Sequence, residues 1–204
     1  MPFELVNVAA LRLRHQRLTA SGLATPEDVV AWLGAVQAQE YPAARWALAL
    51  RMPPDATDAA IERAIDQGQI LRTHVMRPTW HFVTPADIHW MLELTAPRVH
   101  RAMAYYRRQH GLDAAVLTRA TRAFERALRD GQCRTRAELG VRLARAGTMT
   151  TVAKGIPLAL LTIYAELEGV ICSGPRRENS SRTPCWPSAR LAPPACHVTR
   201  RSPP

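Results

Sequence analysis

Apolar residues in the first third of the chain recur at intervals of three and four positions, which is the period of an amphipathic helix. One such helix is predicted over residues 8–20, where an apolar stripe runs beside a basic one. A second begins after Thr25, a good N-cap, with Pro26 at the first helical position. We expect this helix to end near Gln39, because Pro42 disfavours helical geometry at the residue before it.

The period of the pattern changes after Gly68. Before this glycine, two more helices are predicted, a short one within residues 43–52 and one that begins at a Thr57 cap. After it, residues 70–83 contain two short runs rich in β-branched and aromatic residues, one on each side of positions 77–78. This pattern predicts a β-hairpin.

A turn centred on residues 77–78 places His74 opposite His81 and Val75 opposite Trp80 in this hairpin. Several helices followed by a hairpin is the element order of a winged-helix domain, in which the hairpin forms the wing. The first part of the chain is therefore expected to be such a domain.

Two further helices are predicted over residues 84–111, and they are expected to meet near Pro97 because proline disfavours a helix interior. Thr84, with a proline after it, is a start signal for the first of them. The second ends in a basic cluster before Gly111. Four tryptophans lie among apolar neighbours in the sequence and are expected in the core, with a base-stacking platform as the alternative: Trp32, Trp46, Trp80 and Trp90.

The element order repeats after residue 110. A helix over residues 113–130 and a helix that opens with a capping box, Thr135 with Glu138, precede a helix that passes into a strand by Gly174. The second strand of this wing is due after Gly174. The predicted fold is mainly α with short β-hairpin wings (α+β), arranged as tandem winged helix-turn-helix domains. Their expected bounds are 1–110 for the first domain, 111–177 for a second with an incomplete wing, and 178–204 for a tail.

The tail has neither a helical nor a strand period, and six of its residues are proline. Proline at this density removes backbone donors and disfavours both regular structures. Two interpretations fit residues 178–204, a natural disordered basic tail or a shift of the reading frame. We favour the shifted frame, because the change is abrupt and a wing strand left unpaired exposes its edge.

The charge of the chain indicates a polyanionic partner. The formal net charge is +10, and Lys154 is the one lysine among the 27 basic residues. Arginine binds phosphate with two parallel hydrogen bonds, which favours nucleic acid. A GC-rich genome explains the choice of arginine over lysine, but it explains the net charge less well. The candidate phosphate contacts are Arg12, Arg14, Arg45, Arg51, Arg72 and Arg77, each with the alternative role of a solvated charge on a helix or strand.

Nothing in the sequence predicts a membrane span, a secretion signal or a metal site. No apolar run is long enough to cross a bilayer, and the N-terminus lacks the order of a signal peptide. His74 and His81 form a cross-strand pair without a third ligand at tight spacing. The cysteines have no close metal-type spacing either: Cys133, Cys172, Cys185 and Cys196. We expect a cytoplasmic monomer with reduced thiols, no metal and no cofactor.

Three separated stretches, in order, resemble the AlkZ-like family of winged-helix DNA glycosylases: "VVAWLGAVQAQEYPAARWALALR", "ILRTHVMRPTWHFVTPADIHWML" and "RTRAELGVRLARAG". That family releases bulky alkylated purines and unhooks interstrand crosslinks. The resemblance implies that the Gln-x-Gln pair, Gln37 and Gln39, is catalytic. It also implies that the Thr-x-His pair, Thr79 and His81, shapes or contacts the site. Members carry three tandem winged helices, so this chain would hold the first, most of the second and none of the third, as if truncated on its C-terminal side.

The chemistry of such a lesion suits two uncharged side chains. A guanine alkylated at N7 already carries positive charge and leaves as a neutral base, so no general acid is required. One glutamine oxygen can orient the attacking water, and a second can lie near the oxocarbenium-like sugar as a dipole. Residues two apart on a helix diverge by about 200°, so we expect extended backbone at Gln37 that brings both amides to one side. Tyr41 and Arg45 follow Gln39 closely and are candidate DNA contacts.

We therefore predict a DNA glycosylase that hydrolyses the N-glycosidic bond of alkylated purines in double-stranded DNA. N7-alkylguanine is the expected lesion, and interstrand crosslinks are a second candidate lesion. Two alternatives stay open, a winged-helix protein that binds DNA without catalysis, for example a regulator, and an inactive truncated product.

Overall fold

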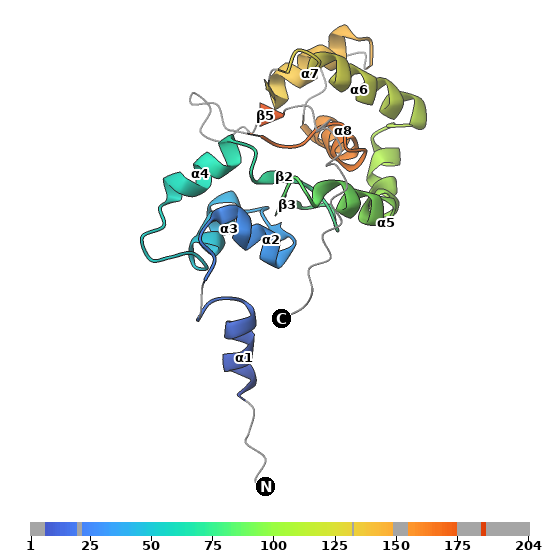
Figure 1. Cartoon of the computed structure of the whole chain (residues 1–204). Helices are drawn as coiled ribbons and strands as arrows, with labels where there is room; N and C mark the ends of the chain where they lie inside the picture. The colour runs from blue at the N-terminus through green and yellow to red at the C-terminus, as the bar shows by residue number, and fades with distance from the viewer. Residues whose placement is uncertain (1–6, 20–21, 132, 149–154, 175–184, 187–204) are drawn as a thin grey trace.

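The computed structural model describes residues 7–19, 22–131, 133–148, 155–174 and 185–186, and Figure 1 shows their arrangement. They form a mainly helical protein with small antiparallel sheets, which confirms the predicted α+β class. The elements are α1 (Val8–His15), α2 (Pro26–Leu33), β1 (Val36–Gln37), α3 (Tyr41–Ala49), α4 (Asp58–Asp66), β2 (Leu71–His74), β3 (Trp80–Val83), α5 (Ile88–Gln109), α6 (Ala114–Ala127), β4 (Arg134–Thr135), α7 (Arg136–Arg145), α8 (Gly155–Leu167) and β5 (Cys185–Trp186).

Helix α1 is shorter than predicted and buries none of its residues. It ends at His15, and the backbone leaves helical geometry at Arg17, whose φ is 56°. Leu11 on the expected apolar stripe is 40% exposed. Figure 1 accordingly shows α1 apart from the other helices, at the lower end of the molecule.

Helix α2 begins as predicted and ends early. The Thr25 side chain accepts a hydrogen bond from the Asp28 amide, as expected of an N-cap. The helix stops at Leu33, because Gly34 adopts a φ of +76° in the left-handed region that favours glycine. Pro42 does not end this helix, since it lies in the first turn of α3, where its missing N–H is harmless.

The predicted hairpin is confirmed, but its register differs by one residue. Thr73 pairs with His81 and His74 pairs with Trp80, so the two histidines are not opposite each other. The loop of residues 75–79 is longer than a two-residue turn. Two tight backbone hydrogen bonds shape it, from the Arg77 amide to the Val75 carbonyl and from the Thr79 amide to the Arg77 carbonyl, both 2.7 Å long.

A third strand completes the sheet in the order β1-β3-β2. Strand β1 pairs antiparallel with β3 and aligns Val36 with Phe82. The sequence pattern did not predict this strand, because the two residues of β1 are too few to show a period.

Helix α5 runs unbroken through Pro97, where two helices were predicted. A proline inside a helix removes one hydrogen bond, and this helix compensates by burying a long apolar face. The buried residues of that face are Ile88, Met91, Leu92, Ala96, Val99 and Met103. The start signal at Thr84 caps a turn that precedes the helix, in which the Thr84 hydroxyl donates to Asp87 over 2.7 Å.

The helices α6 and α7 follow the prediction, and the capping box of Thr135 and Glu138 is present at the start of α7.

The segment after α8 differs from the predicted strand of a second wing. Ser173 forms an isolated antiparallel bridge with Arg72 through a 2.8 Å hydrogen bond, so this segment covers the edge of β2. The part of the chain that the structure describes therefore contains no second hairpin after α8.

Strand β5 lies inside residues 178–204, for which no strand was expected. It pairs with β4 in the register Arg134 with Trp186 and Thr135 with Cys185. Backbone pairing of two residues needs no period in the side chains, which is why the sequence pattern did not indicate it. The rest of the predicted tail lies outside the described residues, and its interpretation stays a prediction.

Two apolar cores flank the sheet. The smaller one joins α2, α3 and α4 to Phe82 of β3. The larger one joins Leu71 and Val83 of the hairpin to α5, α6, α7 and α8. Figure 1 shows α2–α4 and α5–α8 on different sides of β2 and β3. The larger core thus contains residues from before and after position 110, and the domain bounds stay a prediction.

Three of the four tryptophans expected in the core are largely exposed, with Trp32 at 51%, Trp46 at 68% and Trp90 at 49%. Their helices bury only one face, and apolar neighbours in the sequence do not reveal which face a ring occupies. Trp80 packs partly buried against the larger core. None of the described helices is both long and apolar enough to span a bilayer.

Candidate active site

The Gln-x-Gln pair lies in the segment between α2 and α3. Gln37 is the last residue of β1, and Gln39 follows before α3 begins. Neither residue is helical, so the divergence of about 200° that a helix would impose does not apply to them. Both residues are exposed. The expected extended backbone at Gln37 is confirmed, although Gly34 rather than Pro42 ends the helix before it.

The two motifs that the sequence singled out meet in the sheet. Gln37 pairs with His81 in the register of β1 and β3, so the two side chains share a face. The pairing continues one step further, where the Ala38 amide donates to the Trp80 carbonyl over 2.7 Å. Gln39 and Thr79 are the residues next to this hydrogen bond in sequence, so the Gln-x-Gln and Thr-x-His pairs form one constellation.

Where Ala38 faces Trp80, side chains take the place of backbone groups as hydrogen-bond partners between the two strands. The Trp80 amide donates to Gln39 Oε1 at 3.3 Å rather than to a backbone carbonyl. The Ala38 carbonyl instead accepts from Arg72, over 3.1 Å from Nε and 2.8 Å from Nη2. The same Nη2 lies 3.4 Å from the Gln39 carbonyl. Arg72 is only 7% exposed and stacks on the Trp80 ring at 4.1 Å, so it holds the backbone of the glutamine pair.

Arg77 reaches the site from the hairpin loop. Its Nη2 donates to Gln37 Oε1, and its side chain is exposed. The oxygen atoms of both glutamines are thus oriented by the hairpin, one by Arg77 and the other by the Trp80 amide.

His81 is buried and neutral. Burial lowers the pKa of His81, and Arg77 and His74 lower it further, against the raising effect of the hydrogen bond to Thr79. Its Nδ1 lies 2.9 Å from the Thr79 carbonyl, which can only accept, so Nδ1 carries the hydrogen and Nε2 is left as an acceptor.

Two hydroxyl groups beside this constellation are buried without a hydrogen-bond partner among the described residues, Thr79 Oγ1 and Thr73 Oγ1. A buried hydroxyl without a partner is costly, and it is a ready contact for a ligand. Thr73 pairs with His81 across the hairpin and so shares its face. Sequence reasoning missed Thr73, because the predicted register placed His74 opposite His81.

Several predicted DNA contacts are used inside the protein instead. Tyr41 is 7% exposed, and its hydroxyl donates to Glu62 over 2.8 Å. Arg45 forms ion pairs with Asp58, at 2.8 Å, and with Glu62. Arg51 is 9% exposed and donates to the Ala47 carbonyl, and burial lowers its pKa. These residues join α3 to its neighbours, and the pattern of charge along the sequence does not distinguish such arginines from free ones. Arg12 and Arg14, by contrast, are exposed on α1.

No metal centre is found in the described ranges, and the buried Cys172 is not a nucleophile. No three of their His, Cys, Asp or Glu side chains come together as metal ligands would. Burial, with the charges of Glu166 and Cys133, raises the pKa of Cys172 to about 12, so this thiol stays protonated and unreactive. The glutamine pair and its hairpin are thus the candidate active site.

Comparison with known proteins identifies the family of the chain. The family described as DNA glycosylase AlkZ-like matches residues 30–203. An interstrand DNA cross-link repair glycosylase of Streptomyces sahachiroi is 28% identical over 175 residues, which cover 84% of this chain and 46% of that protein. The solved structure of Streptomyces sahachiroi DNA glycosylase AlkZ shares the fold with a TM-score of 0.76 and 24% identity, over 92% of this chain and 50% of the other. The chain spans about half the length of both relatives, and it belongs to the AlkZ-like family of DNA glycosylases.

Proposed function

We propose that this chain hydrolyses the N-glycosidic bond of alkylated purines in duplex DNA, with N7-alkylguanine and crosslinked guanines as the substrate class. The observation that supports the proposal is that the hairpin holds both exposed glutamines, Gln37 opposite His81 and through Arg77, and Gln39 through the Trp80 amide. The relative named as an interstrand DNA cross-link repair glycosylase supports crosslinked DNA as a substrate.

Both glutamines keep the hydrogen-bonding capacity that the reaction needs. Each amide oxygen has two lone pairs, and the hairpin occupies one on each residue. The second lone pair is left to orient water, or to face the positive charge that develops on the sugar. A cationic purine leaves without protonation, so amides suffice where ordinary glycosides need an acid and a base.

The remaining groups suit binding of the departing nucleotide. His81 is neutral and presents an acceptor nitrogen, while Arg77 carries a positive charge beside Gln37. We assign Arg77 to a phosphate that flanks the lesion, since a guanidinium pairs with phosphate bidentately. An exposed motif also suits a bulky adduct, which is hard to extrude into a closed pocket.

The test is release of base from a duplex that contains one N7-methylguanine. Abasic sites are cleaved with alkali and resolved on a denaturing gel. Gln37→Ala and Gln39→Ala are each expected to lower the excision rate by about 100-fold, as loss of one aligned polar group does in other active sites, and to keep duplex affinity. Gln67→Ala, an exposed position at the end of α4, is the matched control.

Two outcomes contradict the proposal. Excision that survives in both glutamine variants excludes the glutamine pair as the catalytic group. Sequence-specific binding to undamaged duplex, with no base release by the native chain, indicates the non-catalytic winged-helix protein instead.

A further inference from the structure

Three of the six arginines that the sequence assigned to DNA are used inside the protein. Arg45 pairs with carboxylates, Arg51 caps α3, and Arg72 supports the glutamine pair. Other exposed arginines are therefore candidates for further contacts to DNA.

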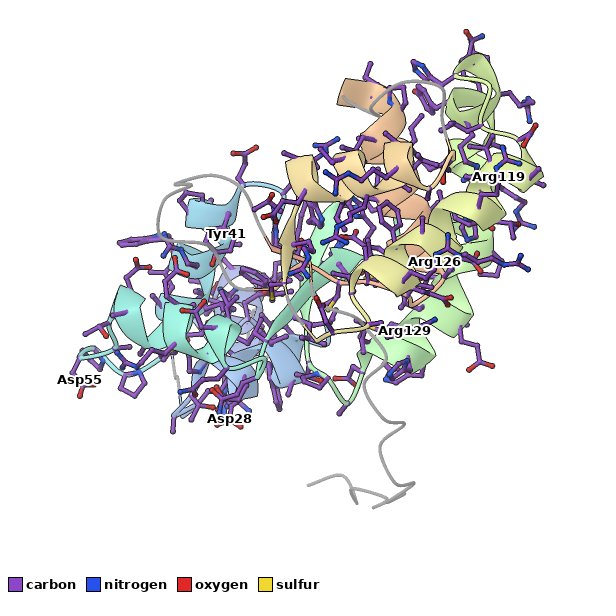
Figure 2. The ribbon with its side chains drawn as sticks, turned by 90° about the horizontal axis from the view of Figure 1, so that it is seen from above. Asp28, Tyr41, Asp55, Arg119, Arg126 and Arg129 are labelled. Carbon is purple, nitrogen blue, oxygen red and sulfur yellow. The ribbon has the colours of Figure 1, made fainter. Side chains whose placement is uncertain are left out.

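One helix carries a row of them. Four exposed arginines, spaced by three, four and three positions, lie along α6 and the turn after it: Arg119, Arg122, Arg126 and Arg129. At 3.6 residues per turn they fall within an arc of about 80° on one face of the helix. Figure 2 shows Arg119, Arg126 and Arg129 in a line along α6, far from Tyr41 in that view. We call these four residues the α6 ridge.

The ridge is free to take a ligand. None of its arginines has a carboxylate partner or a ring contact in the parts of the chain described. Two acids adjoin the ridge in sequence: Asp130 forms an ion pair with Arg134, and Glu125 forms no ion pair with a ridge arginine among the described residues. Four like charges close together raise the local positive potential, which an anion lowers.

The position of the ridge is fixed by the opposite face of α6. That face is buried in the larger core through Leu117, Ala120, Ala123, Phe124 and Ala127. Because the helix cannot rotate without exposing these residues, little backbone order is lost when the ridge binds.

We propose that the α6 ridge binds the phosphate backbone of duplex DNA. This inference rests on the proposed function for its partner, and adds a second contact surface away from the glutamine pair. The ridge is about 15 Å long at a rise of 1.5 Å per residue. One strand of B-DNA presents a phosphate about every 3.4 Å of axis, so roughly four phosphates fall along that length.

The surroundings of the ridge favour DNA over an anionic membrane. A helix that lies on a bilayer exposes large apolar side chains beside its basic ones. The large hydrophobic residues that are exposed in the described ranges lie on other elements, and none is on α6. Guanidinium groups alone match a row of phosphates.

The experiment measures how the affinity for an undamaged duplex depends on salt. The ridge variant is R119Q/R122Q/R126Q/R129Q. The matched control, R63Q/R98Q/R101Q/R108Q, removes four exposed arginines from α4 and α5 and lowers the formal net charge equally. Affinity is read by fluorescence anisotropy from 50 to 300 mM NaCl, with thermal melting to confirm folding.

The quantity compared is the slope of the logarithm of the binding constant against the logarithm of the salt concentration. Its magnitude is expected to be smaller by about 3 to 4 in the ridge variant, at about 0.9 for each phosphate that the protein no longer neutralises. The slope of the control is expected to fall by less than half of that. Replacement of the ridge arginines by lysine keeps the charge, so the slope stays near the native value. The double variant R119Q/R126Q provides the same test at half size, with an expected decrease of about 2.

Several results overturn the inference. They are an unchanged slope in the ridge variant, an equal decrease in the control, or loss of binding to phosphatidylserine vesicles alone with duplex affinity kept. A native chain that binds no duplex overturns the proposed function as well. If the ridge variant loses duplex affinity as expected but the native chain excises no base, only the proposed function is contradicted.

Discussion

Gln37 lies directly opposite His81 in the antiparallel pairing of β1 and β3. The catalytic pair that we propose therefore depends on the hairpin for its position as much as on its own segment. His81 in turn pairs with Thr73, so three strands place one residue each in a row across the sheet. A change in the hairpin should alter excision even where it leaves the glutamines untouched.

The neutral state of His81 predicts a pH dependence of stability. Burial lowers the pKa of His81 below its ordinary value of 6.5. Between the folded pKa and about 6.5 the unfolded chain binds more protons than the folded one, so the free energy of unfolding rises with pH in this window. Stability is therefore expected to fall as pH drops below about 6.5.

Urea unfolding from pH 8 to pH 5 checks this expectation. His81→Gln should lose less stability than the native chain over that range, because it no longer has the group that protonates on unfolding. The exposed His110→Gln serves as control. A His81→Gln profile as steep as the native one would contradict the assignment.

Arg72 is expected to position the glutamine pair rather than to bind phosphate. Its guanidinium holds the Ala38 carbonyl from two nitrogen atoms, and Arg72→Met leaves that buried carbonyl without this partner. We expect a loss of about 1–3 kcal/mol in stability. We also expect kcat for N7-methylguanine excision to fall about 10- to 100-fold, since small displacements of reacting groups are costly.

The binding constant separates the two roles of Arg72. A positioning residue changes kcat and leaves duplex affinity and its salt slope near native, whereas a phosphate contact changes the slope. Arg63→Met, at an exposed position on α4, controls for the loss of charge. A lower slope with unchanged kcat in Arg72→Met would return Arg72 to the phosphate contacts.

Elements whose signals are local could be predicted from the sequence. The caps at Thr25 and Thr57 and the capping box at Thr135 each depend on side chains within one helical turn. The hairpin was equally clear, because its two strands are adjacent in the chain. The family resemblance identified the four residues that the sheet then brought together.

Features that depend on distant parts of the chain could not be predicted. The register of the hairpin follows from its loop, in which Met76 adopts a φ of +65° that no local pattern indicates. The bridge from Ser173 to Arg72 and the ion pairs of Arg45 join segments far apart in sequence. Exposure of individual arginines and tryptophans is decided by such packing, and composition alone does not reveal it.

Gly34 is expected to be required for the direction in which the glutamines point. Its φ of +76° is strained for any other residue, while a Cβ there would meet only Met91 Cε, at an ordinary 3.6 Å. Gly34→Ala should therefore cost about 1 kcal/mol or more through the backbone alone. It should also lower excision, since a helix continued past Leu33 would turn Gln37 away from Gln39.

Gly22→Ala is the control for this prediction, because a Cβ at Gly22 meets nothing within 4 Å and its φ is not positive. Urea unfolding and the excision assay check both expectations. Equal stability and equal excision in Gly34→Ala and Gly22→Ala would show that the end of α2 does not set the geometry of the pair.

A buried pair joins the hairpin to the second half of the chain. His74 Nδ1 lies within hydrogen-bond distance of Glu166 Oε2, and Glu166 on α8 is fully buried. Removal of one partner of a buried pair leaves the other desolvated and poorly compensated, so Glu166→Ala is expected to cost about 3–5 kcal/mol of stability. Glu166→Gln keeps an acceptor oxygen and should cost less. Urea unfolding measures both, and the double variant with His74→Ala completes the double-mutant cycle.

Because the pair connects β2 to α8, its removal should also lower excision at Gln37, which the hairpin positions. Additive losses of stability in the cycle, or full excision in a folded Glu166→Ala protein, would show that the hairpin does not need α8.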